Sequence, residues 1–163
     1  MEKHILLTAF RNTSAQLLLQ GVTEYRTLLL PNDKMKDSEK MIGVISQEAF
    51  DYILSIGQRP NIKDKVHIET TARGSEGCIR TDFTCDSLVD LFEKHGICAK
   101  LSHNAGTSYC NQLYWNGLQY LAQKEMDTRM VFVHIPFIKN ISDFEIFRKQ
   151  FLEVIGCMKE GLL

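Results

Sequence analysis

Short apolar runs of strand length alternate along the whole chain with segments of helical periodicity, and this alternation is the strongest constraint on the fold. The connections between the segments are short. Strands that alternate with helices in this way are typical of an α/β fold with a largely parallel sheet. We therefore expect a three-layer sandwich: a mostly parallel central sheet with helices on both faces. The expected strands are 5–10, 25–30, 51–56, 66–71, 97–101 and 130–135, and the expected helices are 15–20, one from about 37, 84–95, 107–124 and 142–158.

Size and composition indicate one ordinary globular unit. The 163 residues, 44% of them hydrophobic and 24% charged, predict a single domain over 1–163. Nineteen basic and twenty acidic residues leave a formal charge of −1, and this balance argues against a nucleic-acid partner. The apolar run near the N-terminus is too short to span a membrane. Five cysteines without a C-x-x-C pair suit a reducing cytosol and neither a disulfide framework nor a zinc site.

One cysteine stands where a thiol is most readily activated. Cys110 follows the turn Asn104-Ala105-Gly106 and lies in the first turn of the helix expected over 107–124. The unpaired N–H groups of a helix N-terminus favour an anion, so we expect them to lower the pKa of this thiol. The same groups can receive the oxyanion that forms when a thiolate attacks a carbonyl.

A base and an orienting carboxylate are available elsewhere in the chain. His134 lies near the end of the last expected strand, and Glu69 lies late in the strand 66–71. Since the carboxyl ends of parallel strands meet at one edge of a sheet, we expect both residues to converge there with Cys110. Each of the three residues also has a simpler explanation. Cys110 can be a cysteine packed as a small apolar residue, His134 a core histidine, and Glu69 an edge residue that faces solvent. The loop 73–82 is expected to be irregular.

Three longer segments and one short one resemble the pyroglutamyl peptidase I family. The run S-H-N-A-G-T-S-Y-C-N around Cys110 resembles its cysteine signature, and V-F-V-H-I-P-F-I around His134 resembles its histidine segment. The run V-H-I-E-T-T-A-R-G around Glu69 is similar to its glutamate segment, and T-A-F, ending at Phe10, to its opening T-G-F. The order Glu, Cys, His agrees, and the resemblance covers nearly the whole chain.

The resemblance implies a cytoplasmic cysteine exopeptidase that removes an N-terminal pyroglutamyl residue from a peptide with a blocked N-terminus. Cys110 would be the nucleophile, His134 the general base and then acid, and Glu69 the orienting carboxylate. The resemblance also implies a homo-oligomer, and it implies no metal or organic cofactor.

The departures from the family concern the substrate pocket. The loop that follows T-G-F in the family is shortened here, and Ser108 stands where the family has an aromatic. Phe10, Ser108 and Tyr109 are the expected substrate-binding residues, with Tyr109 compensating in part for the missing ring. The family's arginine before the glutamate strand matches either Arg59 or Lys63. A cysteine amidohydrolase with an altered pocket and a catalytically silent homologue that acts as a binding protein therefore stay open as alternatives.

Overall fold

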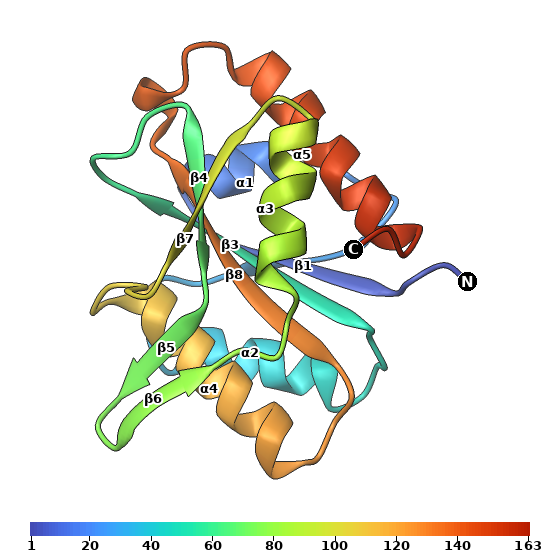
Figure 1. Cartoon of the computed structure of the whole chain (residues 1–163). Helices are drawn as coiled ribbons and strands as arrows, with labels where there is room; N and C mark the ends of the chain where they lie inside the picture. Colours follow the sequence, from blue (N-terminus) through green and yellow to red (C-terminus); the bar gives the residue numbers. More distant parts are fainter.

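A computed structural model describes all 163 residues and contains one six-stranded sheet, a separate two-stranded hairpin and five α-helices (Figure 1). The strand order in the large sheet is β2-β1-β3-β8-β4-β7. None of the helices combines the length and the apolar character needed to cross a bilayer. The strands are β1 (Ile5–Phe10), β2 (Arg26–Leu30), β3 (Tyr52–Arg59), β4 (Lys65–Glu69), β5 (Thr71–Gly74), β6 (Gly77–Arg80), β7 (Cys98–Ser102) and β8 (Arg129–Pro136), and the helices are α1 (Ser14–Leu19), α2 (Lys36–Ile45), α3 (Cys85–Lys94), α4 (Tyr109–Gln123), α5 (Phe144–Lys159) and the 3-10 turn η1 (Ile138–Asn140).

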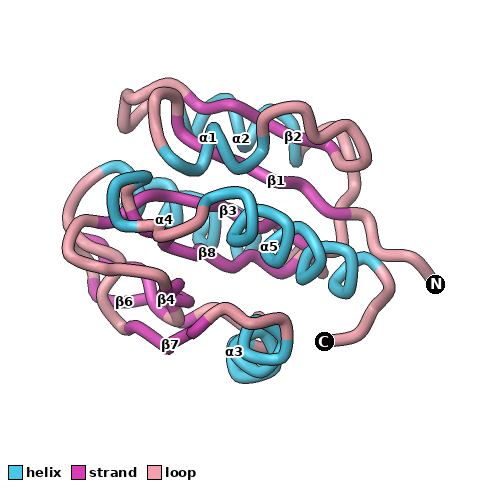
Figure 2. Tube along the Cα trace, turned by 90° about the horizontal axis from the view of Figure 1, so that it is seen from above, coloured by secondary structure: helices cyan, strands magenta, loops and turns pink.

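Helices cover both faces of the sheet, so the expected three-layer α/β architecture is confirmed (Figure 2). One core cluster joins the sheet to α1, α3 and α5, and a second joins it to α2 and α4. Alternate residues of a strand point to opposite faces, and β8 shows the consequence. Val131 and Val133 belong to the first cluster, whereas Phe132 belongs to the second. His134, two residues after Phe132, therefore faces the layer of α2 and α4.

Two strands run against the rest of the sheet. Strands β1, β2, β3 and β8 are mutually parallel, but β4 pairs with β8 in antiparallel fashion, and β7 lies parallel to β4. The expectation that the carboxyl ends of three strands meet at one edge is therefore wrong. Glu69 lies opposite Phe132 in the β4–β8 ladder. The site thus forms over the paired part of β4 and β8, on the face of the sheet that α2 and α4 cover.

The segment expected to be an irregular loop, 73–82, is largely a hairpin. Strands β5 and β6 pair in antiparallel fashion from Thr71↔Arg80 to Gly74↔Gly77. Asn111, the residue after Cys110, holds this hairpin against α4: its side-chain amide donates to Arg73 O at 2.8 Å and accepts from Arg73 N–H at 2.9 Å. These bonds fix the first turn of α4 relative to the strand that continues from Glu69.

Candidate active site

Glu69 and His134 form the centre of the site. Glu69 ends β4 and is fully buried, and His134 is 3% exposed on the neighbouring β8. The antiparallel pairing brings the two side chains together, with His134 Nδ1 at 2.8 Å from Glu69 Oε1. A carboxylate only accepts hydrogen bonds, so this contact assigns the proton to Nδ1 and leaves Nε2 free to act as a base. The carboxylate therefore fixes both the tautomer and the orientation of the ring.

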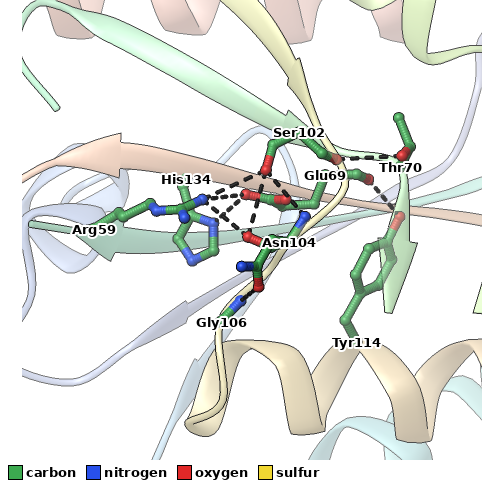
Figure 3. A network of polar contacts seen from close by, with 8 residues as sticks. All are labelled: Arg59, Glu69, Thr70, Ser102, Asn104, Gly106, Tyr114 and His134. Carbon is green, nitrogen blue, oxygen red and sulfur yellow. Dashed lines mark hydrogen bonds and ion pairs between the residues drawn. The ribbon is translucent and has the colours of Figure 1, made fainter. Parts of the chain in front are cut away.

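Arg59 connects this pair to the loop that leads to the cysteine. Its Nη1 donates to Glu69 Oε1 at 3.0 Å and to the carbonyl of Asn104 at 3.0 Å (Figure 3). The Asn104 side chain in turn accepts from Gly106 N–H at 3.0 Å, and Gly106 has a φ of +91°, which glycine adopts without strain. The predicted turn is thus present, and one guanidinium joins it to the buried carboxylate. Of the two basic candidates, Arg59 and Lys63, the structure brings Arg59 to Glu69.

Tyr114 supports Glu69 from the side of the sheet that α4 covers. This tyrosine is fully buried, and its hydroxyl donates to Glu69 O at 2.8 Å (Figure 3). Tyr114 belongs to α4, one helical turn beyond Cys110, so a single helix carries the thiol and steadies the backbone of Glu69. No pattern in the sequence signals this contact, because a buried aromatic on a helix is ordinarily just part of the core.

Cys110 lies beside this network without a hydrogen bond to it. It occupies the first turn of α4, as expected, and it is half-buried. Its sulfur lies over Gly57, where a Cβ atom would stand only 2.6 Å from Sγ. Gly57 is the register partner of His134 in the β3–β8 ladder, so the thiol covers the strand next to the imidazole. The structure therefore brings Glu69 and His134 into contact and sets Cys110 alongside them.

The expected lowering of the thiol pKa is wrong for this unliganded state. Burial raises the pKa of Cys110 from 9.0 to about 12, and the charges of Glu69 and Asp37 act in the same direction. The backbone N–H of Cys110 and the charge of Arg59 lower the pKa, but burial outweighs them. Since a buried sulfur with two carboxylates nearby gains little from a helix terminus, the resting cysteine is a thiol and needs a base to become a nucleophile.

A hollow of about 360 Å³ opens at the thiol. The three residues expected to bind substrate, Phe10, Ser108 and Tyr109, line it together with Cys110. The rings of Phe10 and Tyr109 lie 6.3 Å apart, so Tyr109 supplies an aromatic surface next to the position that Ser108 leaves open. Phe137, which follows β8, adds a further ring to the wall. The hollow is thus small, with three aromatic rings among mostly polar residues, and its size suits a small ring. No group of three or more His, Cys, Asp or Glu side chains is arranged to hold a metal ion.

Comparison with known proteins identifies the family. The family model described as pyroglutamyl peptidase matches residues 60–146, which is just over half of the chain and includes Glu69, Cys110 and His134. The chain belongs to the pyroglutamyl peptidase family. The match agrees with the resemblance that the three segments show in the sequence, and it covers β4, β8 and α4, whereas Gly57 and Arg59 on β3 lie just outside it.

Individual members of the pyroglutamyl peptidase family are similar to much of the chain. A pyrrolidone-carboxylate peptidase of Fusobacterium nucleatum is 29% identical over 141 residues, which cover 72% of this chain and 65% of the relative. One from Alkaliphilus oremlandii is 25% identical over 137 residues, 71% of this chain and 64% of the relative. The chain therefore spans no more than about two thirds of the length of these relatives.

Solved structures of the family share the fold. The pyrrolidone carboxyl peptidase of Fervidobacterium islandicum superposes with a TM-score of 0.85 over 98% of this chain and 99% of that chain, at 19% identity. The pyroglutamyl peptidase I of Bacillus amyloliquefaciens gives a TM-score of 0.79 over 94% and 93%, at 21% identity. At these identities the likeness establishes the three-layer fold, and the chemistry has to be argued from the residues of this chain.

Proposed function

We propose that this protein is a cysteine exopeptidase that hydrolyses the N-terminal pyroglutamyl amide bond of peptides through an acyl-enzyme on Cys110. The observation that carries the proposal is the hydrogen bond of 2.8 Å between His134 Nδ1 and the fully buried Glu69, with the sulfur of Cys110 over the neighbouring Gly57. Membership in the pyroglutamyl peptidase family supports the same chemistry.

The first step forms the acyl-enzyme. His134 Nε2 takes the proton of the Cys110 thiol as the sulfur attacks the carbonyl carbon of the pyroglutamyl residue. Glu69 stabilises the imidazolium that forms, because its Oε1 accepts the hydrogen bond from Nδ1. The oxyanion is received by the backbone N–H of Cys110 at the N-terminus of α4. When the C–N bond breaks, His134 returns the proton to the leaving amine.

The second step releases the pyroglutamyl group. His134, neutral again, takes a proton from a water molecule that attacks the thioester carbonyl. The C–S bond breaks, free pyroglutamate leaves, and the proton returns to the sulfur of Cys110. Because burial raises the pKa of the Cys110 thiol, we propose that His134 takes its proton as the sulfur attacks. For this transfer, bound substrate has to bring the imidazole and the thiol into hydrogen-bond reach.

The hollow at the thiol suits a pyroglutamyl residue. Its lactam has no charged amine, and the side chains of Phe10, Tyr109 and Phe137 offer apolar ring surfaces. Ser108 and Asn32 are among the neutral polar side chains of the same hollow that can bond the lactam amide; Asn12, Thr13 and Gln58 are the others. We propose in addition that residues 1–163 act as one domain in the cytoplasm and as a homo-oligomer. The five free cysteines suit that compartment.

Hydrolysis of a pyroglutamyl-linked fluorogenic amide tests the proposal. Wild type should release the fluorophore, and Cys110→Ser should abolish release while leaving the melting temperature within a few degrees. The matched control is Cys98→Ser, which changes an exposed cysteine and should leave the rate unchanged. Mass spectrometry of quenched wild type should find the acyl group on the peptide that contains Cys110.

Two outcomes would favour other functions. If wild type leaves this substrate intact but hydrolyses other blocked N-terminal amides, with loss in Cys110→Ser, the protein is an amidohydrolase with an altered pocket. If no amide is hydrolysed and pyroglutamyl peptides bind equally well to wild type and Cys110→Ser, the protein is a silent homologue that binds peptides. Release that persists in Cys110→Ser contradicts the proposed nucleophile.

A further inference from the structure

A second, larger hollow opens beside the one that holds the thiol. It has a volume of about 840 Å³ and lies between α1, the edge strand β2 and the turn η1 that follows β8. Asn12, Thr13, Gln58 and Phe137 line both hollows, so the two adjoin at this end of the sheet. We call the larger one the α1 groove. Figure 2 shows α1 and β2 together at one side of the sheet, where the groove lies.

The shared boundary relates the α1 groove to the scissile bond. A pyroglutamyl residue in the small hollow presents its carbonyl to Cys110, and the leaving peptide has to extend out of a space of only about 360 Å³. Gln58 and Phe137 lie at the boundary between the two hollows, so a chain that leaves the small hollow past these residues reaches the α1 groove. A volume of this size accommodates a short extended peptide and excludes a folded protein.

The charges along the two hollows are all of one sign. Arg11 at the small hollow and Lys139 at the α1 groove are the only charged residues that line them, and no acidic side chain does. Both are exposed, and neither forms an ion pair within the protein. A groove with unpaired cations and no anion attracts a ligand that carries negative charge. The leaving portion of a short peptide carries one such group at a defined end, its C-terminal carboxylate.

We propose that the α1 groove binds the leaving portion of the substrate and that Lys139 pairs with its C-terminal carboxylate. The preferred substrates are then short pyroglutamyl peptides with a free C-terminus, rather than C-terminally amidated peptides or small aryl amides. This inference rests on the proposed function, because it assigns the groove to the substrate of that reaction. Lys139 acts as a specificity residue and takes no part in bond cleavage.

The test compares pyroglutamyl-trialanine with its C-terminal amide. For wild type, kcat/KM for the free acid should exceed that for the amide by about two- to five-fold, as expected for an ion pair at an exposed lysine. The ratio should fall to about 1 in Lys139→Gln and should decrease as salt is added. Lys149→Gln, which removes a lysine of α5 outside both hollows, should keep the wild-type ratio.

Hydrolysis of the fluorogenic amide separates this inference from the proposed function. It should proceed equally in wild type and Lys139→Gln, because that substrate has no C-terminal carboxylate. Equal kcat/KM for acid and amide in wild type, or an unchanged ratio in Lys139→Gln, would overturn the assignment of Lys139. If no substrate is hydrolysed, the proposed function fails, and calorimetric titration with trialanine and its amide then decides the inference. Tighter binding of the acid that is lost in Lys139→Gln supports it, and equal binding refutes it.

Discussion

The two halves of the site are held by different forces. On the base side, hydrogen bonds and an ion pair link His134, Glu69 and Arg59 at 2.8 and 3.0 Å. On the nucleophile side, the sulfur of Cys110 makes no such bond and is held by burial and by its close approach to Gly57. Hydrogen bonds define the tautomer and direction of a side chain, whereas packing defines only its position. His134, the proposed base, is therefore pre-oriented, and the thiol of Cys110 is placed nearby in its protonated form.

This contrast predicts two kinds of effect. Substitutions beside His134 should alter proton transfer, and substitutions beside Cys110 should alter the position of its sulfur or the pKa of its thiol. A carboxylate that only fixes a tautomer can be replaced by an amide of the same shape with little loss of packing. A glycine that makes room for a sulfur cannot accept even one methyl group. The following four experiments test the contrast, from the largest expected effect to the smallest.

Glu69→Gln should have the largest effect. The amide carries no negative charge to stabilise the imidazolium of His134, and an NH2 group turned toward Nδ1 would hold the ring in the wrong tautomer. We expect kcat for the pyroglutamyl amide to fall about 10³- to 10⁴-fold, the scale seen when a triad carboxylate becomes an amide. KM should change little. Glu48→Gln, an exposed member of a surface ion pair, is the control. A loss below tenfold would mean that Glu69 does not orient the base.

Gly57→Ala should reduce activity by displacing the sulfur of Cys110. The new Cβ would stand 2.6 Å from the sulfur of Cys110 and 2.8 Å from the ring of Phe132. We expect kcat/KM to fall about 10²-fold, because displacement of a reacting atom by an ångström costs about that much. Gly43→Ala is the matched control, since no atom lies within 4 Å of its Cβ position. Full activity in Gly57→Ala, measured with the same substrate, would show that the thiol does not need this space.

Asp37→Asn should stabilise the protein. Asp37 is fully buried on α2, its Oδ2 has no hydrogen-bond partner, and burial raises its pKa from 3.8 to about 6. A raised pKa means that the folded state binds the proton more tightly, so wild type loses this stability as the pH rises from 3.8 through 6. The shift corresponds to about 3 kcal/mol of cost for the ionised carboxylate at pH 7.

Urea denaturation should therefore show a gain of about 2 kcal/mol for Asp37→Asn at pH 7, and almost none at pH 3.5. Asp86→Asn, on the exposed first turn of α3, should give no gain at either pH. An equal gain at both values would show that the charge of Asp37 is not its cause. Removal of this charge should also lower the pKa of Cys110, which the carboxylate helps to raise.

Alkylation rates should show the smallest difference. With its pKa raised to about 12, Cys110 should react with iodoacetamide at pH 7.5 at least about tenfold more slowly than the exposed Cys78 and Cys98, because the thiolate is the reactive form. Peptide mapping by mass spectrometry measures each rate. The rate at Cys110 should keep rising above pH 9, and the stabilisation from its raised pKa should be lost over pH 9 to 12. Fastest labelling at Cys110 would contradict a protonated resting thiol.

Much of the fold could be predicted from local pattern. The strands 5–10 and 130–135 and the helix 107–124 differ from the observed elements by no more than two residues at either end. Their periodicity and length are properties of the segments themselves. The hairpin β5–β6 was missed because its four-residue strands lack a clear alternation, and it is stabilised by contact with α4 through Asn111.

The site was predicted in part. The resemblance named Cys110, His134 and Glu69, and the structure joins the last two by a hydrogen bond. The role of Arg59 could not be separated from that of Lys63, because a loop sequence does not say which long side chain turns toward the sheet. The pKa of Cys110 was predicted in the wrong direction, since the helix terminus is a local feature and burial is not.

The sequence by itself determined the types and order of the elements other than the hairpin β5–β6, the position of the cysteine at a helix N-terminus, and the three residues that match the family's motifs. Only the tertiary structure decided that β4 runs against β8, that Glu69 meets His134 on the face of the sheet, and that the α1 groove opens beside the thiol. The reason is that periodicity and turn chemistry act over a few residues along the chain. Strand direction, burial and the walls of a groove depend on contacts between residues far apart in sequence.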